Sequence, residues 1–261
     1  LVETYMPSNI ILIIPKENYQ LADLYIRELS WFPGNINIIQ ESEKISFFRV
    51  DGRRYKIGKI EAFHINYSPL SSSIGNQTLK RIGDFIISLT AIFIFSPLLL
   101  LIYILVVVSS KGPGIYTQDR VGLNGKIFKM YKFRSMKLHT ETKYVQTVKN
   151  DPRITKVGKF IRRSSIDELP QLFNVLFGDM SLVGPRPAAI ALSSKYRSIV
   201  KNFMSRHKVK PGMSGLAQIK GYRGGDDIED VKKRLSFDLE YLSSWSLFLD
   251  LKILVLTPIE V

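Results

Sequence analysis

The sequence of 261 residues has no cysteine and only three histidines. Without cysteine, the chain can form neither a disulfide framework nor a thiolate metal site, and it offers no cysteine nucleophile. His64, His139 and His207 are far apart in the sequence and show no metal-ligand spacing. The sequence therefore argues against a zinc enzyme.

Acidic residues become scarce beyond residue 70. Residues 1–70 hold eight basic and eight acidic side chains, whereas residues 71–261 hold 29 basic and 15 acidic ones, so the whole net charge of +14 lies in the second part. Such a basic excess implies an anionic partner: nucleic acid, an anionic membrane surface or a phosphorylated substrate. A Pro/Ser-rich stretch at 68–73 coincides with the change in charge, and we place a domain boundary there.

The first 70 residues predict part of a parallel sheet. The aliphatic run Ile10–Ile14 is typical of a buried strand, residues 17–31 show helical spacing, and Ile36–Ile39 suggests a second strand. No glycine-rich phosphate loop occurs, so we expect no nucleotide site in this part. Because the chain starts at Leu1 and enters a periodic pattern at once, we interpret residues 1–70 as the end of a larger structural or regulatory domain.

One long segment lacks charge altogether. Phe85–Val108 is 24 residues without a charged side chain; as a helix it would measure about 36 Å, against about 30 Å for the hydrocarbon core of a bilayer. We therefore predict that it enters a membrane. Pro97 at its midpoint would kink the helix, and positive charges flank both ends, beginning with Lys80 and Arg81. The positive-inside rule then favours a re-entrant helix at about residues 82–109, with a kinked span as the alternative.

Two basic stretches follow whose function the residues leave open. Within residues 126–137, Lys132 and Arg134 lie among apolar side chains, which suits either a strand at a lipid surface or a set of cations around a pyrophosphate. Within residues 178–187, prolines on both sides of Arg186 stiffen its backbone. This suits a fixed guanidinium for phosphate, or an ordinary turn with a surface arginine.

Two adjacent carboxylates lie between these stretches, after a pair of arginines. In residues 162–171, the spacing of Ser165 and Glu168 predicts a capping box that opens a helix. The same residues suit an anion-handling site, because a helix N-terminus and arginines would hold a phosphate close to Asp167. They would also keep Asp167 ionised and therefore nucleophilic.

Seven motifs follow one another in order and without large gaps between about residues 78 and 257. They are Lys80-Arg81-x-x-Asp84, Ser96-Pro97, Gly112-Pro113-x-x-Tyr116-x-Gln118-x-Arg120-x-Gly122, Lys132-Phe133-Arg134-Ser135-Met136, Asp151-Pro152-Arg153-Ile154-Thr155, Asp167-Glu168-Leu169-Pro170-Gln171 and residues 178–187. Together they resemble the bacterial monotopic polyprenyl-phosphate phosphoglycosyltransferases, the bacterial sugar transferase family.

The resemblance implies an α/β fold in a monotopic membrane protein. A re-entrant helix hairpin that breaks at Ser96-Pro97 would open the compact α/β catalytic domain, residues 71–261, and residues 1–70 would be the remnant of a Rossmann-like α/β domain. The implied location is the bacterial inner (cytoplasmic) membrane, in contact with its lipid, with the catalytic domain on the cytoplasmic face. Whether the protein forms a homo-oligomer is left open.

The implied activity is transfer of a sugar-1-phosphate from a UDP-sugar to undecaprenyl phosphate through a covalent aspartyl-phosphosugar intermediate, with release of UMP. Splitting the reaction lets two phosphate anions occupy the site in turn. By matching position, Asp167 would be the nucleophile, Glu168 its partner, and Arg162 and Arg186 phosphate-binding residues, with Mg²⁺ expected at the dyad and Asp167 as its ligand. Lys132 and Arg134, from the basic stretch described above, are the further cations expected at the substrate phosphates.

Towards the C-terminus, residues 210–224 and 238–252 resemble the branch that loads glucose-1-phosphate to start exopolysaccharide or capsule repeat units. That branch often continues Arg-Gly with Glu-Thr, whereas Gly225-Asp226 follows Arg223-Gly224 in this chain. UDP-glucose is therefore the expected donor, with UDP-galactose or an N-acetylated UDP-sugar as alternatives. A non-catalytic basic membrane scaffold would not need Asp167, and nucleic acid as the partner would leave the apolar segment unexplained.

Overall fold

A small mixed sheet and a larger α/β body make up the computed structural model, which describes residues 9–14, 24–25, 29, 32, 35–40, 52–57, 60–65, 68–137, 151–200, 202–225 and 227–260. The sheet has the order β1 (Asn9–Ile14), β2 (Asn35–Gln40), β4 (Ile60–Ile65), β3 (Gly52–Ile57). β1 and β2 pair in parallel, as predicted, whereas β4 runs antiparallel to both neighbours. Most of the predicted helix at 17–31 lies outside the described residues, and the Rossmann-like remnant stays a prediction.

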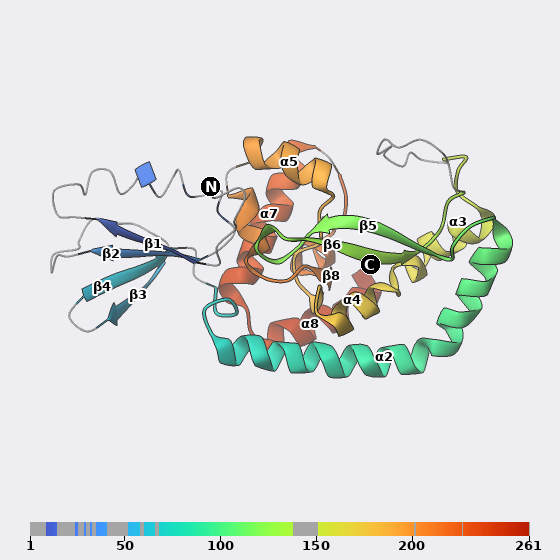
Figure 1. The fold of residues 1–261 in the computed structure, drawn as a ribbon, viewed down its shortest axis with the longest axis horizontal. Coiled ribbons are helices and arrows are strands. Elements are labelled where there is room, and N and C mark those ends of the chain that lie inside the picture. The colour runs from blue at the N-terminus through green and yellow to red at the C-terminus, as the bar shows by residue number, and fades with distance from the viewer. Residues whose placement is uncertain are drawn as a thin grey trace.

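The larger body contains the remaining elements, with the small sheet at one end of the molecule (Figure 1). In chain order they are α2 (Ile74–Ser109), β5 (Ile115–Val121), η2 (Leu123–Gly125), β6 (Ile127–Phe133), α3 (Lys156–Arg163), η3 (Ile166–Glu168), α4 (Gln171–Phe177), β7 (Ser181–Val183), α5 (Ile190–Ile199), η4 (Phe203–Lys208), β8 (Gly212–Ser214), α6 (Leu216–Ile219), α7 (Ile228–Ser244) and α8 (Leu247–Glu260). β5 and β6 form an antiparallel hairpin, and β7 pairs with β8 in parallel.

The charge-free segment lies within α2, which is longer than predicted. Ser73 caps the helix by accepting a hydrogen bond from the main-chain N–H of Asn76, so α2 begins at Ile74 rather than at about residue 82. Lys80 and Arg81 therefore lie inside the helix instead of before it. Pro97 is also internal, and α2 turns upward towards its C-terminal end (Figure 1). Figure 1 shows α2 bent, and the helix is continuous through Pro97, so a break into a hairpin stays a prediction.

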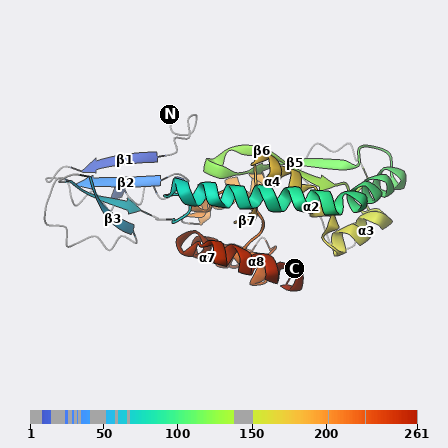
Figure 2. The same cartoon turned by 90° about the horizontal axis from the view of Figure 1, so that it is seen from below.

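Much of α2 presents apolar side chains to the outside. Phe93 and Val108 are 80% and 79% exposed, and most of the leucine, isoleucine and phenylalanine side chains between them are also exposed. Among the described residues, α2 is the helix long and apolar enough to cross a membrane. Figure 2 shows it crossing the whole face of the larger body. An exposed apolar surface of this extent indicates membrane association.

The parts of α2 before and after Pro97 pack against different parts of the same body. In the middle of the helix, before Pro97, Ala91 and Ile92 pack against the main core, in which Val175 and Ile253 are fully buried. Beyond Pro97, Ile102 and Val106 are buried with Phe133 of β6 and Ile161 of α3. α2 is therefore fixed on both sides of its bend, even though its outer face is open.

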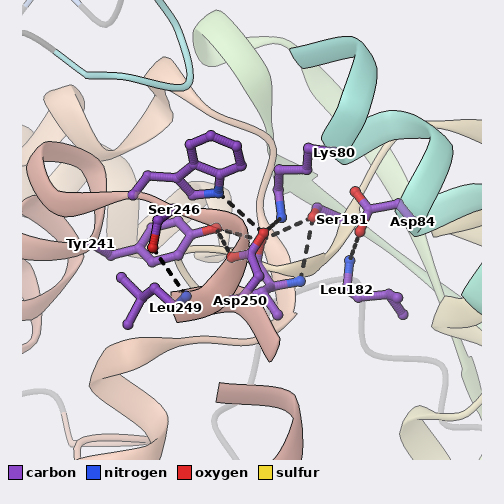
Figure 3. Close-up of polar contacts among 10 residues, drawn as sticks. Lys80, Asp84, Ser181, Leu182, Tyr241, Ser246, Leu249 and Asp250 are labelled. Carbon is purple, nitrogen blue, oxygen red and sulfur yellow. Dashed lines mark hydrogen bonds and ion pairs between the residues drawn. The ribbon is translucent and has the colours of Figure 1, made fainter. Parts of the chain in front are cut away.

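A buried polar cluster ties the start of α2 to the C-terminal helices (Figure 3). The Lys80 ammonium lies 2.6 Å from Asp250 Oδ2 in α8, and both side chains are buried. The Tyr241 hydroxyl donates to Asp250 Oδ1 at 2.8 Å, and Asp84 Oδ1 accepts a hydrogen bond from the main chain of β7 at 3.1 Å. Lys80 and Asp84 are one helical turn apart, so α7, α8 and β7 meet at a single position on α2.

We predict that Lys80→Met lowers the free energy of unfolding by about 3–5 kcal/mol, because it leaves the Asp250 carboxylate buried without its cation. Thermal unfolding in detergent micelles measures the loss. Lys232→Met is the control, since the Lys232–Glu229 pair is exposed and should contribute less than about 1 kcal/mol. Equal losses in the two variants would contradict a structural role for the buried pair.

Candidate active site

Asp167 and Glu168 lie in the single 3-10 turn η3 between α3 and α4. Ser165 precedes the turn in the left-handed region, with φ of 54°, and its side chain makes no capping hydrogen bond. The predicted capping box is therefore wrong. The left-handed residue ends one helix and redirects the chain, so the two carboxylates lie at a sharp corner rather than in the first turn of a long helix.

Glu168 is held by two cations from distant segments. Lys132 Nζ in β6 lies 2.8 Å from Glu168 Oε1, and Arg186 forms a two-pronged contact, with Nη2 at 2.7 Å from Oε1 and Nη1 at 3.2 Å from Oε2. Burial alone would raise the pKa of Glu168, but the charges of Arg186 and Lys132 and their hydrogen bonds outweigh it and hold that pKa well below its usual range. Glu168 is therefore a fixed anion that orients two cations.

Asp167 has a different environment although it is the adjacent residue. Its side chain is buried, with 8% exposed, and among the described residues it forms no hydrogen bond or ion pair. Burial is the largest influence and raises its pKa; the charges of Lys132, Arg162 and Arg186 lower this pKa, the charge of Glu168 raises it, and the net shift is upward. This differs from the expectation that the arginines would dominate. A desolvated carboxylate without hydrogen bonds is a stronger nucleophile than a solvated one.

The chain brings Lys132 and Arg186 to the dyad through close main-chain packing. The Asn174 side chain of α4 makes two hydrogen bonds to the main chain of β6. Its Oδ1 accepts from the Tyr131 N–H at 2.9 Å, and its Nδ2 donates to Lys129 O at 2.7 Å. This places Lys132, the next residue of β6, beside η3.

On the Arg186 side, glycines allow the loop after β7 to lie against β8. A Cβ on Gly184 would lie 2.5 Å from Lys210 O, and one on Gly212 would lie 2.1 Å from Gly184 N. Both distances are too short for a side chain, so only glycine permits this approach. The packing fixes the main chain immediately before Pro185 and Arg186.

Most of the predicted site residues are brought together, with one exception. Asp167, Glu168, Lys132 and Arg186 form the cluster described above, and Arg162 of α3 lies within electrostatic range of Asp167. Arg134 does not join them: it is buried, and its guanidinium donates to main-chain carbonyls at the end of α2, including Ser110 O at 2.7 Å. The geometry contradicts the prediction that Arg134 binds phosphate, because its Nη1 and Nη2 groups already donate to those carbonyls and the side chain is 4% exposed.

Arg223 is a site residue that the sequence did not assign. Burial lowers its pKa, and the charge of Arg186 lowers it further, while the charges of Glu168 and Asp167 raise it. It therefore lies within electrostatic range of both carboxylates and of Arg186. The sequence feature that could have identified Arg223 is its place in the Tyr222-Arg223-Gly224 segment. Because more than fifty residues separate it from Asp167 and Glu168, nothing in the sequence indicated that Arg223 lies near them.

Residues 75–261 match the family described as bacterial sugar transferase. The UDP-glucose:undecaprenyl-phosphate glucose-1-phosphate transferase of Klebsiella pneumoniae is 46% identical over 223 residues, which cover 85% of this chain and 48% of that protein. The protein of the same name from Escherichia coli (strain K12) is 50% identical over 192 residues, 73% of this chain and 41% of that protein.

A relative with a different sugar is also similar. The UDP-N-acetylgalactosamine-undecaprenyl-phosphate N-acetylgalactosaminephosphotransferase of Aeromonas hydrophila is 39% identical over 205 residues, 77% of this chain and 48% of that protein. The chain spans about half the length of these curated relatives or slightly less.

We predict that Arg162→Met shifts the titration of Asp167 to higher pH, because it removes a positive charge that lowers the pKa of this carboxyl. The carboxyl ¹³C shift of labelled aspartate, assigned with Asp167→Asn, measures the pKa. Arg163→Met removes the same charge from an exposed neighbouring position and should leave the titration unchanged. A shift in the opposite direction for Arg162→Met would contradict the electrostatic description of the site.

Proposed function

Because the chain belongs to the bacterial sugar transferase family, we propose that it transfers glucose-1-phosphate from UDP-glucose to undecaprenyl phosphate. Its relatives from Klebsiella pneumoniae and Escherichia coli are named for this activity. The observation that carries the proposal is the unequal dyad: Glu168 is paired with two cations, while the buried Asp167 carboxylate beside it has no hydrogen bond from any residue that the structure describes. The product would start an exopolysaccharide or capsule repeat unit.

Asp167 would act as a covalent nucleophile in two steps. In the first, one of its carboxylate oxygens forms a bond to the sugar-bearing phosphorus of the UDP-sugar, and the bond from that phosphorus to the bridging oxygen breaks, so that UMP leaves with the electron pair. In the second, an oxygen of undecaprenyl phosphate attacks the same phosphorus and the Asp167 carboxylate is regenerated. The two anionic phosphates thus occupy the site one after the other.

The surrounding cations would neutralise the charge of the pyrophosphate. Arg186 and Lys132 are fixed by Glu168, and Arg162 and Arg223 lie within electrostatic range of Asp167. Preorganised positive charge of this kind stabilises a transition state in which negative charge moves to the leaving phosphate. Glu168 would therefore contribute by holding two of these cations in position.

Mg²⁺ is the cofactor that we propose, with Asp167 as its protein ligand. The Asp167 carboxylate is engaged by no hydrogen bond within the described part of the chain, and Mg²⁺ favours one or two carboxylates together with substrate phosphates and water. The donor set at η3 therefore fits this cation when substrate is present. When bound, it would supply further neutralisation of the pyrophosphate charge.

The packing of α2 supports a monotopic arrangement at the bacterial inner membrane. The helix is held by Asp250 before its bend and by Phe133 and Ile161 beyond it. Because both ends are attached to the same body, a bent, re-entrant path that returns to one side accounts for the contacts better than a full span does. The body and its active site would then face the cytoplasm, where UDP-sugars are available.

A non-catalytic membrane scaffold would need the apolar face of α2 and basic residues alone. It would gain nothing from a buried Asp167 whose pKa is raised by burial, because a charge of this kind costs stability. The cost is explained when the carboxylate reacts. The unequal dyad therefore favours the enzyme.

We predict that Asp167→Asn abolishes UMP release from UDP-glucose in the presence of Mg²⁺ and undecaprenyl phosphate, because the amide cannot form the acyl phosphate. With radiolabelled donor and no acceptor, the wild-type chain should trap label and the variant should not. Asp119→Asn, at an exposed position of β5, is the control and should retain both properties. Unchanged turnover in Asp167→Asn would exclude the covalent mechanism, and release of UDP would indicate an ordinary glycosyltransferase.

We also predict that UDP-glucose gives the highest kcat/KM among UDP-glucose, UDP-galactose and UDP-N-acetylgalactosamine. The similarity to the glucose-1-phosphate transferases is the reason for this expectation. Initial rates of UMP release across the three donors measure the preference. A higher kcat/KM for either other donor would leave the chemistry in place and change the assigned sugar.

A further inference from the structure

Arg206 of η4 lies behind the loop that carries Arg186. Its Nη2 donates a hydrogen bond to the main-chain oxygen of Arg186 at 2.6 Å and lies 2.9 Å from Asp238 Oδ2 of α7. The two side chains of this ion pair are 3% and 2% exposed. A buried pair of charges therefore connects α7 to the main chain of the residue whose guanidinium holds Glu168.

A buried ion pair of this kind is a poor source of stability. Removing each ion from water costs several kcal/mol, and an apolar pair of similar volume is often at least as stable. The surroundings would accept such a pair, because the Arg206 guanidinium lies 5.5 Å from the Phe203 ring and Phe203 packs in an apolar cluster with Leu235 of α7. An apolar side chain could not donate a hydrogen bond to Arg186 O. The ion pair and an apolar pair would therefore differ in whether the Arg186 carbonyl is held in place, more than in stability.

The Arg186 carbonyl lies between two points at which the loop is already held. Pro185 and Pro187 have no N–H to donate. On one side, Pro185 O accepts from Gly212 N–H at 3.0 Å, and on the other, Ala188 O accepts from the main chain of β5 at 3.3 Å. Between these two points, Arg206 donates a hydrogen bond to the carbonyl of Arg186, the residue whose side chain binds Glu168.

We propose that Arg206 and Asp238 are positioning residues that set the Arg186 guanidinium on Glu168 and toward the pyrophosphate of the bound UDP-sugar. The charge of Asp238 holds the guanidinium of Arg206 as a buried ion pair, Arg206 donates a hydrogen bond to the carbonyl of Arg186, and Arg186 then reaches Glu168 at 2.7 Å. This inference rests on the proposed function, because it is the reaction at Asp167 that requires Arg186 to be held in one place.

The test is the double variant Arg206→Met with Asp238→Leu, which replaces the ion pair with apolar side chains. We expect its thermal unfolding temperature to stay close to that of the wild-type protein. The kcat for UMP release should fall about 100-fold, the order of loss expected from a misplacement of about 1 Å, while KM for UDP-glucose stays close to the wild-type value. A folded double variant with wild-type kcat would overturn the inference.

A double-mutant cycle separates positioning from a general structural effect. Arg186→Lys keeps a positive charge but loses the two-pronged contact with Glu168. If Arg206 and Asp238 act through Arg186, adding their double variant to Arg186→Lys should lower kcat little further. Full additivity of the two losses would contradict the inference.

A matched control uses another buried carboxylate paired with an arginine, the Asp151–Arg153 pair before α3. Asp151→Asn should lower the unfolding temperature and leave kcat unchanged. A fall in kcat equal to that of the test variant would show that any buried ion pair has this effect. Absence of UMP release by the wild-type protein would contradict the proposed function itself, whereas release by the wild type and the test variant alike contradicts only the positioning role.

Discussion

The site depends on a difference between two adjacent carboxylates: Glu168 is hydrogen-bonded to two cations, and Asp167 is not. Lys132 and Arg186 both bind Glu168, and neither makes a hydrogen bond to Asp167. If the cations were paired with Asp167 instead, its lone pairs would be occupied and its nucleophilicity reduced. Glu168 thus accepts the hydrogen bonds of both cations, while their positive charges still act electrostatically on Asp167. An active carboxylate needs this electrostatic effect without the hydrogen bonds.

This division requires three distant segments to meet at one turn. β6 brings Lys132, the loop after β7 brings Arg186, and η3 brings the carboxylates. Asn174 fixes β6 against α4, and glycine contacts fix the Arg186 loop against β8. These contacts belong to the fold, and they determine where the charges lie.

Local pattern in the sequence predicted the strands β1 and β2, the apolar segment and the clustering of four site residues. Prediction from the sequence failed where a polar side chain binds a partner that is far away along the chain. The start of α2 was placed too late because Lys80 and Arg81 were interpreted only as positive charges that flank the apolar segment, whereas Lys80 pairs with Asp250 and Arg81 donates to carbonyls of α4. Arg134 was assigned to phosphate for the same reason, although the end of α2 occupies its donors. No local spacing reveals such partners.

The contacts of α2 also connect the apolar surface to the site. Asp84 accepts a hydrogen bond from the main chain of β7, and the Tyr241 hydroxyl oxygen lies 3.1 Å from Val183 O at the end of the same strand. The Arg186 loop begins directly after β7, so the strand that is fixed to the membrane-associated helix also carries the residue that holds Glu168. Under the proposed function, a lipid phosphate would reach Asp167 from the membrane side, and a soluble nucleotide would reach it from the other. The attachment of β7 to α2 would keep the site at a constant height above the lipid surface, as the proposed reaction with a lipid and a soluble substrate requires.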